Sequence, residues 1–301
     1  MKVFGLLYML RVGTAILAGD TTDEEFCDSE RGLCYTDFEV QVYRNGEHQD
    51  GLSAVIRKGA CLDFWNVEAS LGALFPAYCR PPEAPCKLYS EVGQAVNDCS
   101  NIDNKSSIYL VPQGRVFMWP TIELGHQVKV AHLEDTPNGE PVVVETLSHS
   151  PRIFRLHNLF SHTEADALIE NALSIKTEAG RLKRSSTGAE GYNMNVHRTS
   201  HNAFDGTSAV AMALKRRSMA LLGYPEFRDT WCDGAQVLRY APGQAYRPHL
   251  DAFFGPDDGG GGGGHNYDAA RGGTDRYATV LLYLSDVEAG GETVFPHGRP
   301  V

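Results

Sequence analysis

Residues 238–251 read LRYAPGQAYRPHLD, and this stretch decides how the rest of the chain is interpreted. Its apolar and aromatic residues predict one strand over Ala235–Tyr240 and another over Tyr246–Asp251. Residues two apart on a strand point to the same side, so His249 and Asp251 can present an imidazole nitrogen and a carboxylate oxygen to one metal ion. A histidine and a carboxylate are part of the facial triad that binds non-haem Fe(II). Alone, such a pair is more often chance or an ordinary structural histidine.

Further motifs surround this stretch. They read ETLS at residues 145–148, PRIF at 151–154, RTS at 198–200, RYATVLLYLSDV at 276–287 and GGETVFP at 290–296. Together with the Tyr, Pro-Gly-Gln, Tyr and His-x-Asp order of the central stretch, they resemble the prolyl 4-hydroxylase alpha-subunit-like family of Fe(II)- and 2-oxoglutarate-dependent dioxygenases. The resemblance covers about residues 143–301. Because several motifs keep the family's order and spacing, coincidence is a poor explanation.

The resemblance implies a fold and a reaction. The expected fold is α+β or mainly β, with a double-stranded β-helix (jelly roll) and helices packed outside it. The implied enzyme is a procollagen-proline 4-dioxygenase-like oxidoreductase that converts peptidyl proline to 4-hydroxyproline. Its implied cofactors are Fe(II), 2-oxoglutarate, O2 and ascorbate. In such an enzyme the cofactor supplies the oxidising chemistry, and the protein orients the reactants and excludes water.

Family position also implies roles for six further side chains. The 2-oxoglutarate contacts are Tyr240 and Thr293; the proline-pocket walls are Tyr246 and Arg276; the peptide-backbone contacts are Arg198 and Ser200. A proline-rich peptide or protein suits such a site, because a polyproline II ligand is extended, preformed and read by aromatic faces and main-chain hydrogen bonds. Each residue also has a plainer interpretation: the tyrosines as strand aromatics and Arg276 as a surface charge.

Two of the family's functional residues find no match. The distal metal-binding histidine and the 2-oxoglutarate-anchoring lysine are expected several strands after the Phe-Pro motif, whereas the sequence ends at Val301. His265, His297 and Arg299 stand at the wrong positions to replace them. We therefore expect a jelly roll that is incomplete at its C-terminus, with exposed strand edges. We also expect little or no hydroxylase activity from this chain.

Three other functions compete with this interpretation. The chain can be a luminal, non-catalytic protein that keeps the groove to bind peptides. It can also be a related dioxygenase that acts on lysine or another side chain. A metal-dependent hydrolase is a weaker alternative, because such sites usually need further histidines and carboxylates close by. Zinc competes with iron for the same pair, since imidazole and carboxylate do not by themselves select iron.

Cysteine usage points to an oxidising compartment. Six of the seven cysteines lie in the first hundred residues: Cys27, Cys34, Cys61, Cys79, Cys86 and Cys99. Six cysteines allow about 15 pairings, so the sequence leaves the connectivity open. The absence of a Cys-x-x-Cys motif disfavours a zinc or thioredoxin-like site. We expect disulfides here and an unpaired, buried Cys232.

The N-terminus predicts a signal peptide or anchor over residues 1–19. Lys2 precedes the apolar run Val3–Leu10, and a small-x-small pattern follows, although Arg11 interrupts the run. Membrane association is expected only through this segment. With the glycosylation sequon at Asn104, it favours the endoplasmic reticulum lumen or the secretory pathway. The net charge of −11 disfavours nucleic-acid binding. The oligomeric state is left open.

Composition separates two regions after residue 19. Residues 20–145 form a Cys-rich region of unknown role, with strands predicted at Ile108–Val111 and Val142–Glu145. Residues 146–301 form the dioxygenase-like region. It should contain a third strand over Tyr277–Leu284, whose nearly continuous apolar run is typical of burial on both faces. The run Gly259–Gly264 is predicted to be a flexible loop insertion.

Two helices are predicted in the second region. Ser161 and Glu164 have the spacing of a capping box, and Leu168, Ile169, Ala172 and Leu173 follow at helical intervals. The other helix should span Ser208–Leu222, where Val210, Leu214 and Leu221 share one face. Both apolar faces are interpreted as core packing.

Overall fold

The computed structural model describes residues 15–16, 26–28, 33–35, 37–79, 85–185, 198–224, 226–249, 251 and 276–298. The chain divides into two compact units. Unit 1 comprises residues 1–133, 141–157 and 221–225; unit 2 comprises residues 134–140, 158–220 and 226–301. Within the described part of the chain, no helix has the length and apolar character needed to cross a membrane.

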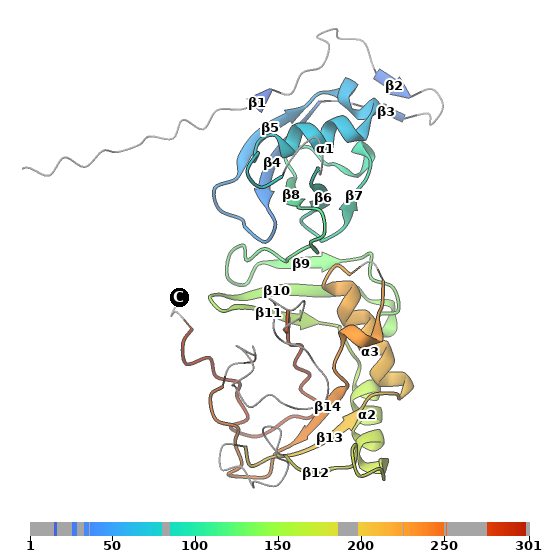
Figure 1. The fold of residues 1–301 in the computed structure, drawn as a ribbon, viewed down its shortest axis with the longest axis vertical. Helices are drawn as coiled ribbons and strands as arrows, with labels where there is room; N and C mark the ends of the chain where they lie inside the picture. The colour runs from blue at the N-terminus through green and yellow to red at the C-terminus, as the bar shows by residue number, and fades with distance from the viewer. Residues whose placement is uncertain are drawn as a thin grey trace, which may run out of the picture. The chain divides into compact units, whose positions relative to one another are not determined.

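Unit 1 contains a six-stranded mixed sheet with the order β1-β5-β4-β8-β6-β7 (Figure 1). The strands are β1 Ala15–Ile16, β4 Phe38–Arg44, β5 Leu52–Ile56, β6 Lys87–Ser90, β7 Ala95–Val96 and β8 Ser107–Val111. The pairs β1–β5 and β4–β8 are parallel, and the others are antiparallel. Helix α1, Phe64–Gly72, packs Val67 and Leu71 into the same core as Ile108 and Leu110. The predicted strand at Ile108–Val111 is confirmed.

Two disulfides lie inside this core. Cys61 pairs with Cys99 and Cys79 pairs with Cys86, and all four residues are buried. The first disulfide joins the short 3-10 helices η1, Lys58–Leu62, and η2, Cys99–Asn101. The prediction of disulfides in the Cys-rich region is therefore confirmed. The hairpin of β2, Phe26–Asp28, and β3, Leu33–Tyr35, places Cys27 opposite Cys34 in the strand register.

A second, antiparallel sheet of unit 1 has the order β11-β10-β9. Its strands are β9 Gln127–Val130, β10 Val142–His149 and β11 Arg152–His157. Along β10, Val142, Val144 and Thr146 are buried while Val143 and Glu145, on the opposite face, are only partly buried, as the two-residue period of a strand requires. This confirms the strand predicted at Val142–Glu145.

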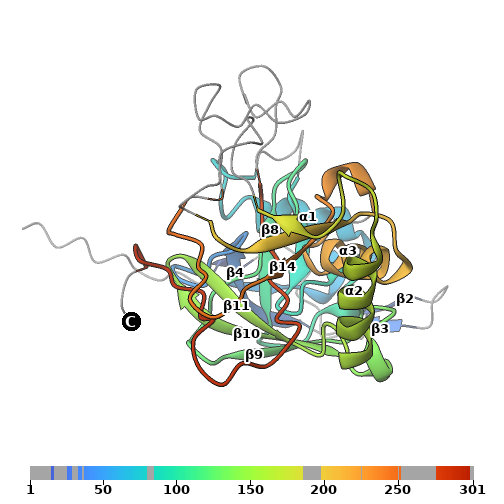
Figure 2. The same ribbon diagram turned by 90° about the horizontal axis from the view of Figure 1, so that it is seen from below.

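Unit 2 combines the helices α2 and α3 (Figure 2) with a three-stranded antiparallel sheet, β12-β13-β14 (Figure 1). The elements are α2 His162–Ser174, α3 Ala209–Leu221, β12 Lys183–Arg184, β13 His201–Asp205 and β14 Ala235–Arg239, with the 3-10 helices η3 Pro137–Gly139 and η4 Asp229–Trp231. Leu168 of α2 packs against Ala211 and Leu214 of α3. The two helices and the strand predicted at Ala235–Tyr240 are confirmed. Together, the sheets and three α-helices of the described residues agree with the expected α+β class.

The start of α2 is fixed by local and distant hydrogen bonds. The Ser161 hydroxyl accepts from the Glu164 amide, and the Glu164 carboxylate accepts from the Ser161 amide, so the predicted capping box is present. Arg217 of α3 is 5% exposed and donates to the Asp135 and Leu159 carbonyls and to Glu164. The buried guanidinium thus ties α2, α3 and the segment 134–140 of unit 2 together.

Two expected strands are wrong. Between Tyr246 and Asp251, the described residues make only one isolated β-bridge, Arg198 with Tyr246. The segment 276–298 contains no strand, and its residues Leu281 and Tyr283 are 55% and 63% exposed. A strand needs a hydrogen-bonded neighbour, and no described residue forms a ladder beside this segment. Its apolar run was therefore insufficient to make a buried strand, although Leu282 and Leu284 pack against the core of unit 2.

Candidate metal centre

His249 and Asp251 lie side by side in the irregular chain after β14. The Nε2 atom of His249 is 3.4 Å from Oδ1 of Asp251, and their side chains are 40% and 44% exposed. This distance allows the two atoms to be neighbouring ligands of one ion, since metal–ligand bonds of about 2.1 Å place adjacent ligand atoms about 3 Å apart. The pair meets without the regular strand that was expected to align it.

The hydrogen bond that His249 makes with the main chain leaves its Nε2 atom available as a metal ligand. Its Nδ1 atom lies 2.9 Å from the Arg247 carbonyl oxygen, which can only accept a hydrogen bond. Nδ1 therefore carries a proton, and in the neutral imidazole Nε2 is then an acceptor. Nε2 of His249 and Oδ1 of Asp251 are then two lone-pair atoms that face one another, and both can bind one cation. The donor set therefore fits a divalent cation.

The Asp251 carboxylate has a different partner for each oxygen. The Thr279 hydroxyl donates to Oδ2 at 2.6 Å, and the Arg276 Nη1 atom is 3.5 Å from Oδ1. Arg276 also reaches Asp233, at 3.6 Å. The structure thus brings Arg276 to the predicted metal pair. Thr279 was missed by sequence reasoning, although it lies inside the RYATVLLYLSDV motif that contains Arg276.

Tyr246 stacks on the candidate ligand His249, with ring centroids 3.8 Å apart and planes 21° apart. The guanidinium of Arg198 lies over the Tyr246 ring, 4.7 Å from its centroid. Thr199 joins the same two segments, because its amide donates to the Ala245 carbonyl and its hydroxyl accepts from the Ala245 amide. The RTS motif is therefore held against the residues that precede the metal pair.

The other predicted peptide contact, Ser200, lies inside unit 2. Ser200 is fully buried, and its hydroxyl is 3.0 Å from that of Ser185. The Nε atom of Arg198, itself 7% exposed, donates to the Ser200 hydroxyl at 3.3 Å. In this structure Ser200 supports Arg198. The role of Ser185 carried no signal in the sequence.

The predicted 2-oxoglutarate contacts lie apart from this network. Tyr240 is 44% exposed directly after β14. The Thr293 hydroxyl is 2.7 Å from the hydroxyl of Tyr283. Among the described residues, no hydrogen bond joins Tyr240 or Thr293 to His249 or Asp251. The structure therefore gathers His249, Asp251, Tyr246, Arg276 and Arg198, and leaves these two residues outside the contacts.

No third ligand stands beside the pair within the described ranges. Searched over those residues, the chain holds no group of three or more His, Cys, Asp or Glu side chains that could bind one metal ion. His297 is exposed in the segment 276–298. His265 and the run Gly259–Gly264 lie outside the described residues.

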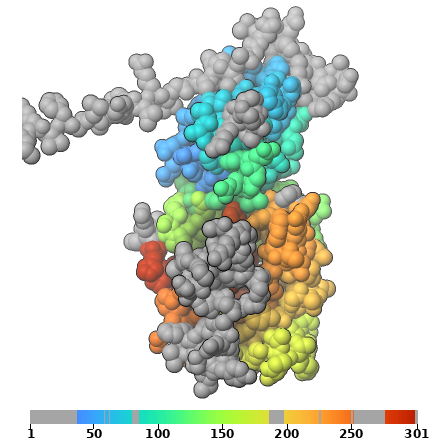
Figure 3. Space-filling view, in the orientation of Figure 1, coloured from blue at the N-terminus to red at the C-terminus, as the bar shows by residue number. Residues whose placement is uncertain are grey.

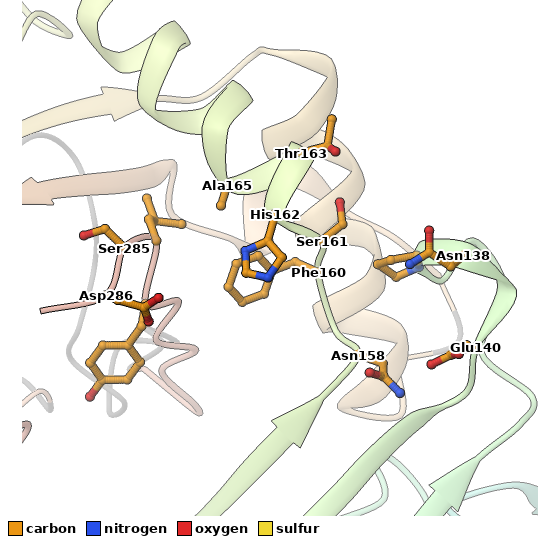
Figure 4. A pocket seen from close by; sticks show the side chains of 13 residues that line it. Asn138, Glu140, Asn158, Phe160, Ser161, His162, Thr163, Ala165, Ser285 and Asp286 are labelled. Carbon is orange, nitrogen blue, oxygen red and sulfur yellow. The ribbon is translucent and has the colours of Figure 1, made fainter.

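Hollows elsewhere in unit 2 do not include the metal pair. One cavity of about 440 Å³ lies at the start of α2, where Phe160 and His162 stand between Ser285 and Asp286 on one side and Asn138 and Glu140 on the other (Figure 4). Another, of about 680 Å³, lies beyond the end of α2 and is lined by Phe204 and Asp205 among others. The side chains of His249 and Asp251 line neither of these two hollows and are 40% and 44% exposed.

Comparison with known proteins gives relatives from one family. Prolyl 4-hydroxylase 5 of Arabidopsis thaliana is 33% identical over 168 residues, which are 55% of this chain and 52% of that protein. Prolyl 4-hydroxylase 2 is 33% identical over 166 residues, 53% of this chain and 48% of that protein. Prolyl 4-hydroxylase 13 is 30% identical over 151 residues, 50% of this chain and 49% of that protein. All three relatives are Arabidopsis thaliana proteins, and they bear the name of the family that the motifs resemble.

The match covers about half of each relative's length. No family model matches the chain. No solved structure matches it either. The resemblance of the motifs to prolyl 4-hydroxylases is nevertheless confirmed by the sequence identity across half the chain.

Proposed function

We propose that this relative of the prolyl 4-hydroxylases carries part of an Fe(II)- and 2-oxoglutarate-dependent dioxygenase that hydroxylates peptidyl proline at carbon 4. The observation that carries the proposal is the approach of His249 Nε2 to Asp251 Oδ1, 3.4 Å apart within the family's His-x-Asp motif. The two side chains would hold the iron. Iron with 2-oxoglutarate and O2 supplies the oxidising chemistry when bound, and ascorbate is the implied reductant.

The protein's part in this function is to orient ligands. Thr279 fixes one oxygen of Asp251, and the Arg247 carbonyl leaves Nε2 of His249 available. The hydroxyls of Tyr240 and Thr293 are proposed to donate hydrogen bonds to 2-oxoglutarate. For Thr293 this requires exchange of its contact with Tyr283.

A proline-rich segment is the proposed substrate. Tyr246 and Arg276 would form the walls of the pocket for its proline ring. Arg198 and Ser200 are proposed to contact the peptide backbone, which for the buried Ser200 requires exposure of its hydroxyl. In support, the aromatic ring of Tyr246 stacks directly on the candidate metal ligand His249. A polyproline II segment suits such a wall, because its conformation is preformed and its rings pack on aromatic faces.

The proposed architecture around this site is a jelly roll, to which β13 and β14 would contribute strands. The proposed location is the endoplasmic reticulum lumen or the secretory pathway. Support for the location comes from the two buried disulfides of unit 1, because disulfides persist in oxidising compartments.

A luminal, non-catalytic peptide-binding protein is the second candidate. It is favoured by one observation: the described residues offer His249 and Asp251 without a third clustered ligand. A site held by His249 and Asp251 alone would bind metal weakly and turn over slowly. On that premise we propose little or no hydroxylase activity.

Metal and peptide binding test the two candidates together. Mn(II) is titrated into the full chain, and free Mn(II) is measured by electron paramagnetic resonance. We expect saturable binding that is lost in His249→Ala and in Asp251→Ala and is retained in the matched control His297→Ala. Binding that survives in both ligand variants would overturn the metal site.

Succinate formation from 2-oxoglutarate is then measured with proline-rich and lysine-rich peptides. Slow turnover that only proline-rich peptides stimulate supports the hydroxylase. Peptide binding without metal binding or turnover supports the non-catalytic candidate. Stimulation only by lysine-rich peptides would overturn the proposed substrate, and robust turnover by the chain would contradict the expected weak activity.

A further inference from the structure

The segment 103–106 forms an exposed turn between η2 and β8. The Ser106 amide donates to the Asp103 carbonyl at 3.1 Å, and Lys105 has a φ of 66°. Asn104 occupies the outer position of this turn and is exposed. Residues 104–106 are also the only Asn-x-Ser/Thr sequence in the chain. Sequence and exposure thus single out one side-chain amide.

The hydrogen bonds of this turn leave the Asn104 nitrogen available. The Oδ1 atom of Asn104 accepts from the Glu39 amide at 2.8 Å, which holds the turn against β4. In a planar amide the nitrogen lies on the other side of the carbonyl carbon. A substituent on Nδ2 would therefore leave the oxygen's hydrogen bond intact.

Ser106 supplies the second observation. Its Oγ atom is buried and has no hydrogen-bond partner among the described residues. Buried hydroxyls are usually hydrogen-bonded, so an unpaired one calls for an explanation. A hydroxyl at this third position is what the glycosylation sequon requires.

We infer that Asn104 is a site of N-linked glycosylation. Nδ2 forms a bond to the anomeric carbon of a lipid-linked oligosaccharide diphosphate, loses one proton, and the lipid diphosphate leaves. The glycan then projects from the turn that precedes β8 in unit 1, five residues after the disulfide-bonded Cys99. The disulfides belong to the same oxidising compartments in which secreted proteins acquire such glycans.

The full chain, preceded by a cleavable secretion leader, is expressed in eukaryotic cells and recovered from the lumen or the medium. We expect one glycan that peptide N-glycosidase F removes, which converts Asn104 to aspartate in the peptide mass spectrum. Asn104→Gln and Ser106→Ala should abolish the glycan. Ser106→Thr and the control Ser100→Ala should keep it. Leader-processed wild-type chain with unmodified Asn104 would overturn the inference.

A separate observation concerns the metal pair, and it rests on the function proposed above. Thr279 donates to Asp251 Oδ2 at 2.6 Å from a position 28 residues further along the chain. Both residues are exposed, and among the described residues the Thr279 hydroxyl and the Arg276 guanidinium are the side-chain groups that contact the carboxylate besides His249. With Oδ2 bonded to Thr279, Oδ1 is the oxygen turned to His249 Nε2.

We propose that Thr279 is a positioning residue that selects the metal-binding oxygen of Asp251. Hydrogen bonds to a ligating carboxylate fix its orientation, and their loss typically lowers metal affinity about 10- to 100-fold. Thr279 would act through Asp251 and would not be a ligand itself. Its effect should therefore appear in metal affinity and depend on the hydroxyl.

The same Mn(II) titration tests this role on the full chain. We expect Thr279→Val to weaken Mn(II) binding about 10-fold or more, and Thr279→Ser to restore it. Thr136→Val is the matched control, since the Thr136 side chain makes no capping hydrogen bond. Wild-type affinity in Thr279→Val would overturn the positioning role while the metal site stands. Failure of wild-type chain to bind Mn(II) would overturn the proposed function itself.

Discussion

Two apolar runs of similar composition differ in structure: one forms a buried strand, and the other forms no strand and is partly exposed. Residues 107–111, SIYLV, form strand β8, in which Ile108, Tyr109, Leu110 and Val111 are at most 1% exposed. Residues 279–284, TVLLYL, form no strand, and Leu281 is 55% exposed. Strand β8 has β4 on one side and β6 on the other, whereas no described residue pairs with the second run. Apolar sequence therefore makes a buried strand only where neighbours complete its hydrogen bonds.

The red end of the described segment 276–298 is visible at the surface in the space-filling view (Figure 3). Within the segment 276–298, Val294 and Phe295 are 73% and 46% exposed. By contrast, the apolar core of unit 1 is buried and contains two disulfides. Stability should accordingly respond strongly to changes in unit 1 and weakly to changes in this segment.

The largest effect should come from the Cys61–Cys99 disulfide. Its removal in Cys61→Ser/Cys99→Ser opens a loop of 38 residues, which on the chain-entropy model costs about 4 kcal/mol. Cys232→Ser is the matched control, because Cys232 is free and half-buried, and it should change stability by about 0.5 kcal/mol or less. Urea unfolding followed by far-ultraviolet circular dichroism measures both. Equal losses of unfolding free energy in the two variants would contradict the expectation that unit 1 contributes more to stability.

A leucine pair tests the two apolar runs directly. Leu110→Ala should destabilise unit 1 by about 3 kcal/mol, because it leaves a cavity in a closed core. Leu281→Ala removes the same atoms from an exposed position and should cost about 0.5 kcal/mol or less. Thermal and urea unfolding give the two values. A large loss in Leu281→Ala would mean that the second run is buried in solution.

The buried charge of unit 2 should have a smaller effect. Arg217→Met leaves the Asp135 and Leu159 carbonyls and the Glu164 carboxylate without their donor, at a cost of about 2 kcal/mol. Arg216→Met removes a neighbouring guanidinium that is exposed and should be nearly neutral. Hydrogen exchange of α2 separates a local from a global loss. Similar protection in both variants would argue against the role of Arg217.

The smallest effect concerns pH. Burial raises the pKa of Glu164, but hydrogen bonds from Arg217 and the Ser161 amide outweigh it, and the net pKa is below its ordinary value. A carboxylate with a lowered folded-state pKa stabilises the fold above its unfolded pKa of about 4.3 and loses this contribution as pH falls through the folded value. The wild type should therefore lose stability more steeply on acidification than Glu164→Gln. Parallel pH profiles would refute this; Glu170→Gln, on the exposed face of α2, is the control.

The sequence predicted part of the candidate site. It identified His249 and Asp251 as a pair, and it identified Tyr246, Arg276 and Arg198, which the structure places in one network. It missed Thr279 and Ser185, because a hydroxyl that supports a distant side chain leaves no pattern of its own. The role of Ser200 as a peptide contact stays a prediction; in the structure this residue is buried, and its hydroxyl accepts a hydrogen bond from Arg198.

The sequence alone determined what depends on nearby residues. The capping box of Ser161 and Glu164 and the periodic helices α2 and α3 arise from contacts within a few positions, which spacing records. Tertiary structure alone decided which cysteines pair, which apolar run finds neighbours, and that Thr279 meets Asp251 across 28 positions. Such contacts join residues that are far apart in the sequence. They depend on the tertiary fold, and the local sequence around each partner does not record it.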